Sequence, residues 1–76
     1  MYTEFDTYLK RVGAEIKKVR LSKKLTQLDL AIKAEMEENA VQRIEAGRTN
    51  LTIKTLIKIA LALAVELHTL LPSLFP

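Results

Sequence analysis

Four polar residues near the middle of the chain could read nucleic-acid bases. They are spaced so that one side of a helix would carry them all: Glu38, Asn39, Gln42 and Arg43. Arginine can donate two hydrogen bonds to guanine O6 and N7, asparagine can pair in a similar way with adenine, and glutamate can accept a bond from cytosine N4. The same residue types also form the solvated face of many ordinary helices. Their chemistry alone therefore leaves both interpretations open.

The surrounding stretch, residues 25–47, predicts the elements that would position these side chains. It contains two short amphipathic segments, residues 26–33 and 37–46, separated by a tight turn. Thr26 is suited to cap the first helix, and Gly47 to end the second in a left-handed conformation. The expected apolar positions are Leu25, Leu28, Leu30, Ala31, Met36, Val41 and Ile44. A short helix, a turn and a second helix with an exposed polar face form the unit that places a helix in the DNA major groove.

Three further helices are expected, which predicts an all-α, five-helix, single domain over residues 1–76. The first begins at Thr3 or Asp6 and runs to Lys23, the fourth begins after Thr52, and a short fifth covers about residues 66–71. Gly13 lies inside the first helix and weakens it by about 1 kcal/mol relative to alanine, so we expect it to serve close packing. The apolar positions of this helix are Phe5, Leu9, Val12, Ile16 and Val19.

Composition offers no support for catalysis. The 76 residues include no cysteine and one histidine, His68, and no pair of acids is spaced for acid–base work. No metal, cofactor or small-molecule ligand is therefore expected. The chain shows no secretory signal and no apolar run long enough for a bilayer, which predicts a cytoplasmic protein without a membrane partner.

Charge is unevenly distributed. The net charge is +3, and residues 1–24 carry seven basic side chains against three acidic ones. Residues 25–47 carry five acids against two bases, so the segment expected to touch DNA is the acidic one. A basic balance permits a nucleic-acid partner but does not require one.

A collinear set of residues resembles the lambda-repressor-like, Cro-like (XRE) helix-turn-helix family of DNA-binding proteins. The matching positions cover roughly residues 16–71: Leu25-Thr26-Gln27, Leu30-Ala31, Val41, Arg43-Ile44-Glu45, Gly47, Asn50-Leu51-Thr52, Thr55-Leu56, Val65 and Leu70-Leu71. Two departures stand out. Glu35 occupies the turn position where the family usually has glycine, and Glu37 the helix start where it usually has serine or threonine.

The resemblance implies a role for each candidate residue. Glu38, Asn39 and Arg43 match the positions that reach base edges, and Gln42 flanks them. An ion pair between Arg20 and Glu45 is expected to be structural. Phosphates of double-stranded DNA are expected to contact Thr26, Gln27, Arg48, Asn50 and Lys54.

A homodimer is expected because one recognition helix gives little specificity. The C-terminal segment, residues 65–76, is apolar enough to form the contact through Leu67, Leu70, Leu71, Leu74 and Phe75. The alternative is that this run covers the chain's own core. The resemblance fits a phage-type repressor, a restriction–modification controller or an antitoxin. A competing hypothesis is a protein-interaction module that kept the fold and lost DNA binding, which the acidic segment would explain.

Overall fold

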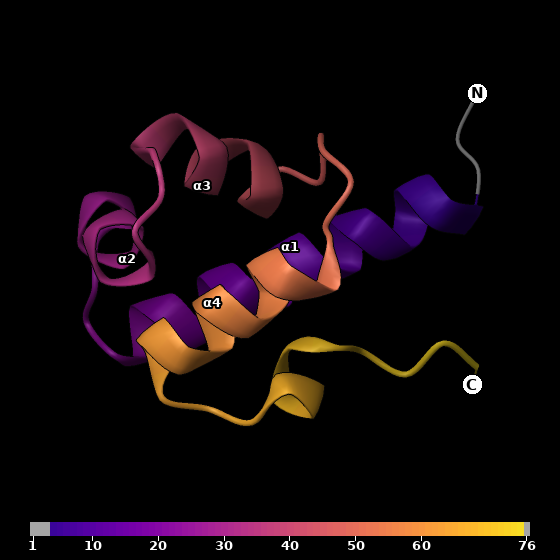
Figure 1. Ribbon diagram of the computed structural model, residues 1–76. Helices are drawn as coiled ribbons and strands as arrows, with labels where there is room; N and C mark the ends of the chain where they lie inside the picture. Colours follow the sequence, from indigo (N-terminus) through magenta and orange to yellow (C-terminus); the bar gives the residue numbers. More distant parts are fainter. Residues whose placement is uncertain (1–3, 76) are drawn as a thin grey trace.

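Four α-helices and one short 3-10 helix build the protein in the computed structural model, which describes residues 4–75 (Figure 1). They are α1 (Glu4–Ser22), α2 (Gln27–Ala34), α3 (Glu38–Glu45), α4 (Ile53–Leu63) and η1 (Leu67–Leu70). The all-α prediction is confirmed, and the expected boundaries agree to within one or two residues. The fifth element, η1, is a single 3-10 turn rather than an α-helix, because its hydrogen bonds span three residues: Thr69 N–H donates to the Glu66 carbonyl and Leu71 N–H to the His68 carbonyl.

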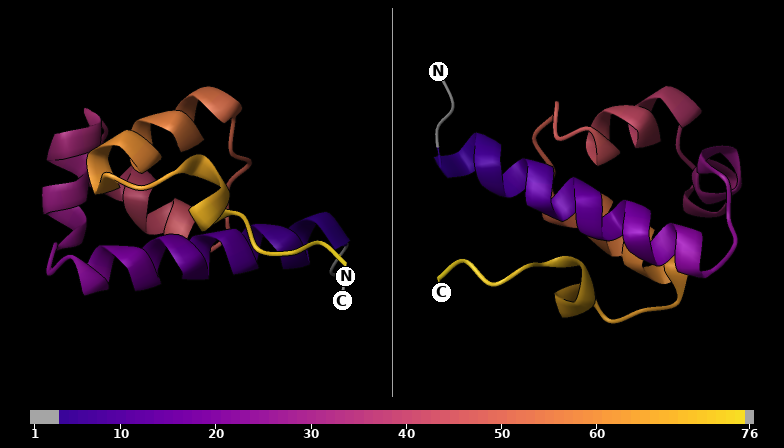
Figure 2. Two further views of the ribbon diagram at one scale, coloured as in Figure 1. Left: turned by 90° about the horizontal axis from the view of Figure 1, so that it is seen from below. Right: turned by 180° about the vertical axis from the view of Figure 1, so that it is seen from behind.

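α1 is the long element against which the others are arranged. α3 lies on one side of it and α2 stands near its C-terminal end. α4 lies in front of α1 and runs along it in the view of Figure 1, and the C-terminal segment returns along the opposite side (Figures 1 and 2). Seen from behind, α1 is uncovered along its outer side (Figure 2). All four α-helices and η1 contribute to one hydrophobic core, made of Val12, Ile16, Leu30, Ala31, Val41, Ile44, Leu56, Ile59, Ala60, Leu63 and Leu70.

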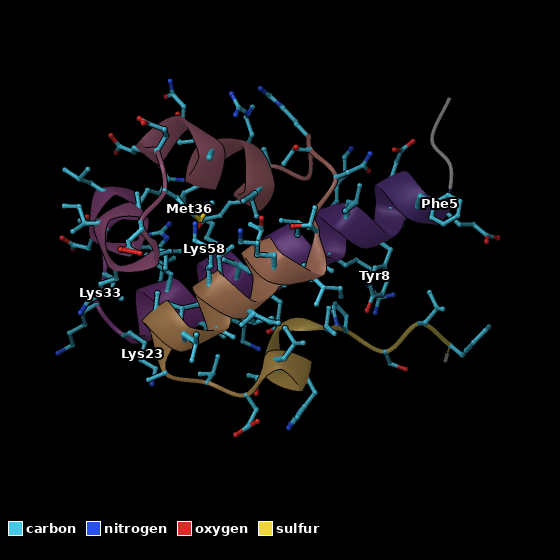
Figure 3. All side chains as sticks on the ribbon, in the orientation of Figure 1. Phe5, Tyr8, Lys23, Lys33, Met36 and Lys58 are labelled. Atoms are coloured by element: carbon cyan, nitrogen blue, oxygen red, sulfur yellow. The ribbon has the colours of Figure 1, made fainter. Side chains whose placement is uncertain are left out.

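Two residues expected on buried helix faces are exposed instead. The Phe5 side chain is 81% exposed, because it lies at the end of α1 that extends beyond the other helices (Figure 3). Leu28 is 49% exposed, since Leu30, Ala31 and Ala34 form the buried side of α2.

The C-terminal apolar run divides between the core and the surface. Leu70 is fully buried and Leu67 packs against the core, so the prediction that Leu70 contacts a second chain is wrong. Leu71, Leu74 and Phe75 remain exposed. The segment is held along α1 by the Tyr8 hydroxyl, which donates a 2.6 Å hydrogen bond to the Pro72 carbonyl (Figure 3).

Each α-helix ends with one residue in the left-handed conformation. These residues are Lys24, Glu35, Gly47 and Ala64, with φ between 55° and 70°. In each case the next residue donates its N–H to a carbonyl five positions earlier, as Met36 does to Ala31 at 2.8 Å. Three of the four lack glycine's freedom, which costs about 1 kcal/mol each. The Glu35 carbonyl is also held by Lys58 of α4, whose Nζ lies 3.3 Å away (Figure 3).

The chain's two glycines lie where α1 meets the end of α3. A Cβ atom on Gly13 would stand 2.4 Å from the Ile44 carbonyl oxygen and 2.6 Å from that of Glu45. One on Gly47 would stand 2.7 Å from the Lys10 Cα. The backbones of α1 and α3 therefore touch directly, which confirms the expectation that Gly13 serves close packing.

A buried ion pair fastens the same crossing. The Arg20 guanidinium donates to both Glu45 carboxylate oxygens, at 2.7 Å and 3.0 Å, and to the Leu25 carbonyl at 2.7 Å. The two side chains are 7% and 3% exposed. Gln27 Nε2 donates to the same carboxylate at 3.0 Å. The expected ion pair is present, and it joins α1, the start of α2 and the end of α3.

Gly13→Ala should lower the free energy of unfolding by about 2 kcal/mol or more. Alanine favours the helix by about 1 kcal/mol, but its methyl group would overlap backbone atoms that cannot rotate away. Urea unfolding followed by circular dichroism measures the change. Thr7→Ala, on an exposed turn of the same helix, is the control and should shift stability by less than about 0.5 kcal/mol. A neutral Gly13→Ala would show that the helices are farther apart.

Arg20→Met and Glu45→Met should each destabilise the fold by roughly 3 kcal/mol, because each leaves an unpaired buried charge. The double mutant should recover much of that loss. Urea midpoints of the wild type, the two single mutants and the double mutant complete the double-mutant cycle. Purely additive losses of stability would contradict the coupling.

Candidate nucleic-acid interface

The exposed face of α3 brings the four predicted base-reading residues together. Val41 and Ile44 bury one side of the helix, which turns the opposite side outward. That side carries Glu38, Asn39, Gln42 and Arg43, all of them exposed. The side chains of α3 extend away from the rest of the molecule at its upper edge (Figure 3). The arrangement presents donors and acceptors on one convex surface.

The start of α2 lies beside the end of α3, because Gln27 Nε2 donates to Glu45. The Thr26 hydroxyl accepts from the Asp29 N–H at 2.9 Å, and the Asp29 carboxylate accepts from the Thr26 N–H at 2.9 Å. The Thr26 N–H, and after it the Thr26 hydroxyl, lower the pKa of the Asp29 carboxyl below its ordinary value. The capping box formed by Thr26 and Asp29 therefore stabilises α2 at a pH above the ordinary carboxyl pKa. This stabilisation is lost as the pH falls through the lowered pKa of Asp29.

The sequence predicted only a phosphate contact for Gln27, and the structure gives this side chain a second role. Its amide nitrogen is bound to Glu45, so the side chain also belongs to the ion-pair network. An amide nitrogen carries two protons, and this bond uses one of them. The second proton is the donor that a phosphate could take.

The loop after α3 carries further predicted phosphate contacts, and part of it borders Arg43 and Ile44. Arg48, Asn50 and Lys54 are exposed, and the Thr52 hydroxyl caps α4 by accepting from the Thr55 N–H at 3.1 Å. A hollow of about 160 Å³ separates α3 from this loop and is lined by Met36, Ala40, Arg43, Ile44, Thr49, Asn50, Leu51 and Thr55. The predicted phosphate contacts therefore come from the start of α2, from the loop that follows α3 and from the first turn of α4.

The exposed side of α3, which we call the recognition face, is acidic at its start and basic at its end. Glu35 lies in the turn, Glu37 is the N-cap residue and Glu38 is in the first turn of α3, while Arg43 and Arg48 lie at and beyond its end. Glu37 makes no side-chain capping bond. Carboxylates near a helix N-terminus stabilise the free protein. Toward DNA they are repulsive, so attraction is concentrated at the far end of α3.

Sequence reasoning missed a second apolar stripe on α4. Ile53, Ile57 and Leu61 are 63%, 44% and 75% exposed, four residues apart along one side of the helix. The buried residues of α4 hid this stripe, because the segment is apolar on nearly every side. A second set of apolar residues at four-residue spacing was the available signal.

Residues 4–75 contain neither a candidate metal site nor a candidate membrane-spanning helix. No three His, Cys, Asp or Glu side chains gather into a group that could hold a metal ion. Within the same range, no helix has the length and apolar character needed to cross a membrane.

Known proteins share this fold. The immunity repressor of Bacillus phage phi105 is 37% identical over 59 residues, which cover 78% of this chain and 41% of the repressor. This chain therefore spans less than half the length of that relative.

Solved structures of restriction–modification controllers are also similar. C.AhdI from Aeromonas hydrophila matches with a TM-score of 0.80 and 29% identity, over 82% of this chain and 94% of the controller. C.Esp1396I, solved as a tetramer with its natural 35 base-pair operator, matches with a TM-score of 0.75 and 42% identity, over 78% of each chain. The helix-turn-helix family model matches residues 16–70, most of the sequence, and the chain belongs to that family.

Proposed function

We propose that this protein is a sequence-specific DNA-binding transcriptional regulator that acts as a homodimer in the cytoplasm. The observation that carries the proposal is the outward face of α3, where Glu38, Asn39, Gln42 and Arg43 are exposed together. The helix that bears them is clamped to α1 by backbone contact and a buried ion pair. A rigid helix with a polar outer face is what major-groove reading requires.

Restriction–modification control is the biological role we favour. The support is the 42% identity to C.Esp1396I and the coverage of nearly the whole C.AhdI chain. The phage repressor is the second candidate, since its matched segment is 37% identical but represents 41% of a longer protein.

The predicted contact residues divide into base readers and phosphate contacts. Asn39 and Arg43 read base edges, with adenine and guanine as their best partners, and Gln42 flanks them. Glu38 accepts from cytosine N4. Phosphate contacts set the position of the protein on the duplex. They are made by Thr26, Gln27, Arg48, Asn50 and Lys54.

The dimer surface combines α4 with the end of the chain. η1 packs against both α1 and α4, so the exposed C-terminal residues and the α4 stripe belong to one half of the molecule (Figure 1). Five of their side chains are exposed apolar groups with a second copy as proposed partner: Ile57, Leu61, Leu71, Leu74 and Phe75. Two-fold pairing would present two α3 helices to half-sites about one helical turn (~10 bp) apart, or a multiple of that.

Leu61→Lys should convert the dimer to a monomer at micromolar concentration, because it places a charge in an apolar contact. Ile32→Lys is the matched control, since Ile32 is 67% exposed on α2, and it should stay dimeric. Sedimentation equilibrium gives both masses. A monomeric wild type, or a dimer lost only in Ile32→Lys, would contradict the proposed surface.

Selection of binding sites from random DNA tests the function directly and should return a pseudo-palindrome. Competition binding at constant salt then separates the two acids of α3. Glu37→Ser should strengthen binding to every sequence by a similar factor, since repulsion of phosphates carries no sequence information. Glu38→Ala should relax preference at one base pair, a cytosine, by about 1–3 kcal/mol.

Two outcomes would overturn these assignments. Equal gains on all sequences for Glu38→Ala would make Glu38 a repulsive bystander rather than a reader. The absence of saturable binding at low salt, for wild type and both variants, would favour the protein-interaction module instead.

A further inference from the structure

A large hollow lies between α1 and the loop that follows α3. It encloses about 740 Å³ and is lined by Asp6, Leu9, Lys10, Ala46, Gly47, Arg48, Thr49 and Asn50. Two of the described side chains that line it are cationic, Lys10 and Arg48, and one is anionic, Asp6. Its walls come from elements far apart in sequence, which the Gly47–Lys10 backbone approach brings together.

This hollow continues the recognition face. Thr49 and Asn50 line both it and the smaller hollow beside Arg43 and Ile44. A continuous polar surface therefore runs from α3, past the loop, to α1. α1 extends past the loop in this direction, beyond the end of every other helix (Figure 1).

We propose that Lys10, together with Arg48, binds a DNA backbone phosphate outside the segment that α3 reads. This inference rests on the proposed function and extends it, because it adds a residue of α1 to the contact surface. The ligand chemistry is a phosphodiester monoanion, which two cations can share and which carries no base information.

The packing of Lys10 suits this role. Its backbone and Cγ lie against Gly47, so the base of the side chain is positioned by the α1–α3 crossing. Lys10 precedes Gly13 by three residues, which places it about 5 Å along the helix axis from the point where α1 touches α3. The α1–α3 crossing would therefore fix the position of the Lys10–phosphate contact relative to the base-reading side chains of α3.

Asp6 lies in the same hollow, one turn before Lys10. Its carboxylate opposes an incoming phosphate, so it should limit the affinity that the two cations provide. Opposite changes at Lys10 and Asp6 should therefore have opposite effects on DNA affinity.

The test measures the affinity of the full chain for its selected site as a function of salt. Lys10→Met keeps the aliphatic stem against Gly47 and removes the charge, and its urea midpoint should match that of wild type. Its affinity should fall about 5- to 10-fold at 0.1 M salt, with a salt slope smaller by about 0.9. Base preference should not change. Asp6→Asn should raise affinity on all sequences.

Lys23→Met is the matched control, because Lys23 is exposed beyond the other end of α1, far from α3 (Figure 3). It should leave the salt slope unchanged. Trimming base pairs stepwise from each end of the duplex provides a second measurement, in which Lys10→Met and wild type should become equal once the flanking phosphate is gone.

An unchanged slope for Lys10→Met, with specific wild-type binding intact, would overturn this contact and leave the proposed function standing. An equal loss of slope in Lys23→Met would also overturn it, since the effect would then be general attraction. Failure of the wild type to bind DNA would instead refute the proposed function.

Discussion

Backbone contact between α1 and α3 is the constraint on which the rest of the structure depends. Only glycine fits at position 13, because any Cβ would overlap the Ile44 and Glu45 carbonyls. The end of α3 is thereby pressed onto a long helix, and the side of α3 opposite Val41 and Ile44 faces outward with the polar side chains. A short helix of eight residues is not stable alone in water. Its orientation therefore comes from this crossing rather than from its own sequence.

The buried ion pair makes the crossing directional. Burying Arg20 and Glu45 costs desolvation that their attraction barely offsets, so the pair adds little net stability. A misplaced helix, however, would leave two charges unpaired in the core. Gln27 is also bound to Glu45, so one carboxylate of α3 is hydrogen-bonded to both α1 and α2. Such a network favours one arrangement of the helix-turn-helix over its alternatives.

Local signals made most of the fold predictable from sequence. Threonine caps, a terminal glycine and apolar spacing located the helices, because each reflects hydrogen bonds within a few residues. The resemblance added the ion pair between residues far apart in sequence. The predictions that were wrong concern residues whose burial depends on tertiary packing. Leu70 and Phe5 are both apolar, yet one closes the core and the other projects past it, and only the packed arrangement of α1 decides which.

The candidate site has the same limitation. The sequence shows which residue types it contains, but not which of them also hold the fold together or lie beside the loop after α3. Nothing local reveals that Gln27 serves the ion pair, or that Lys10 borders the loop after α3.

Under the proposed function, the acidic start of α3 lowers non-specific affinity more than it lowers specific affinity. Phosphate repulsion by Glu37 weakens binding everywhere, whereas Glu38 recovers a hydrogen bond wherever cytosine is in reach. Occupancy of a genomic operator depends on the ratio of the two affinities rather than on either alone. Attraction from the basic far end of α3 can then hold the protein on DNA while its acidic start rejects most sequences. The charge pattern that first argued against DNA binding is therefore compatible with a selective regulator.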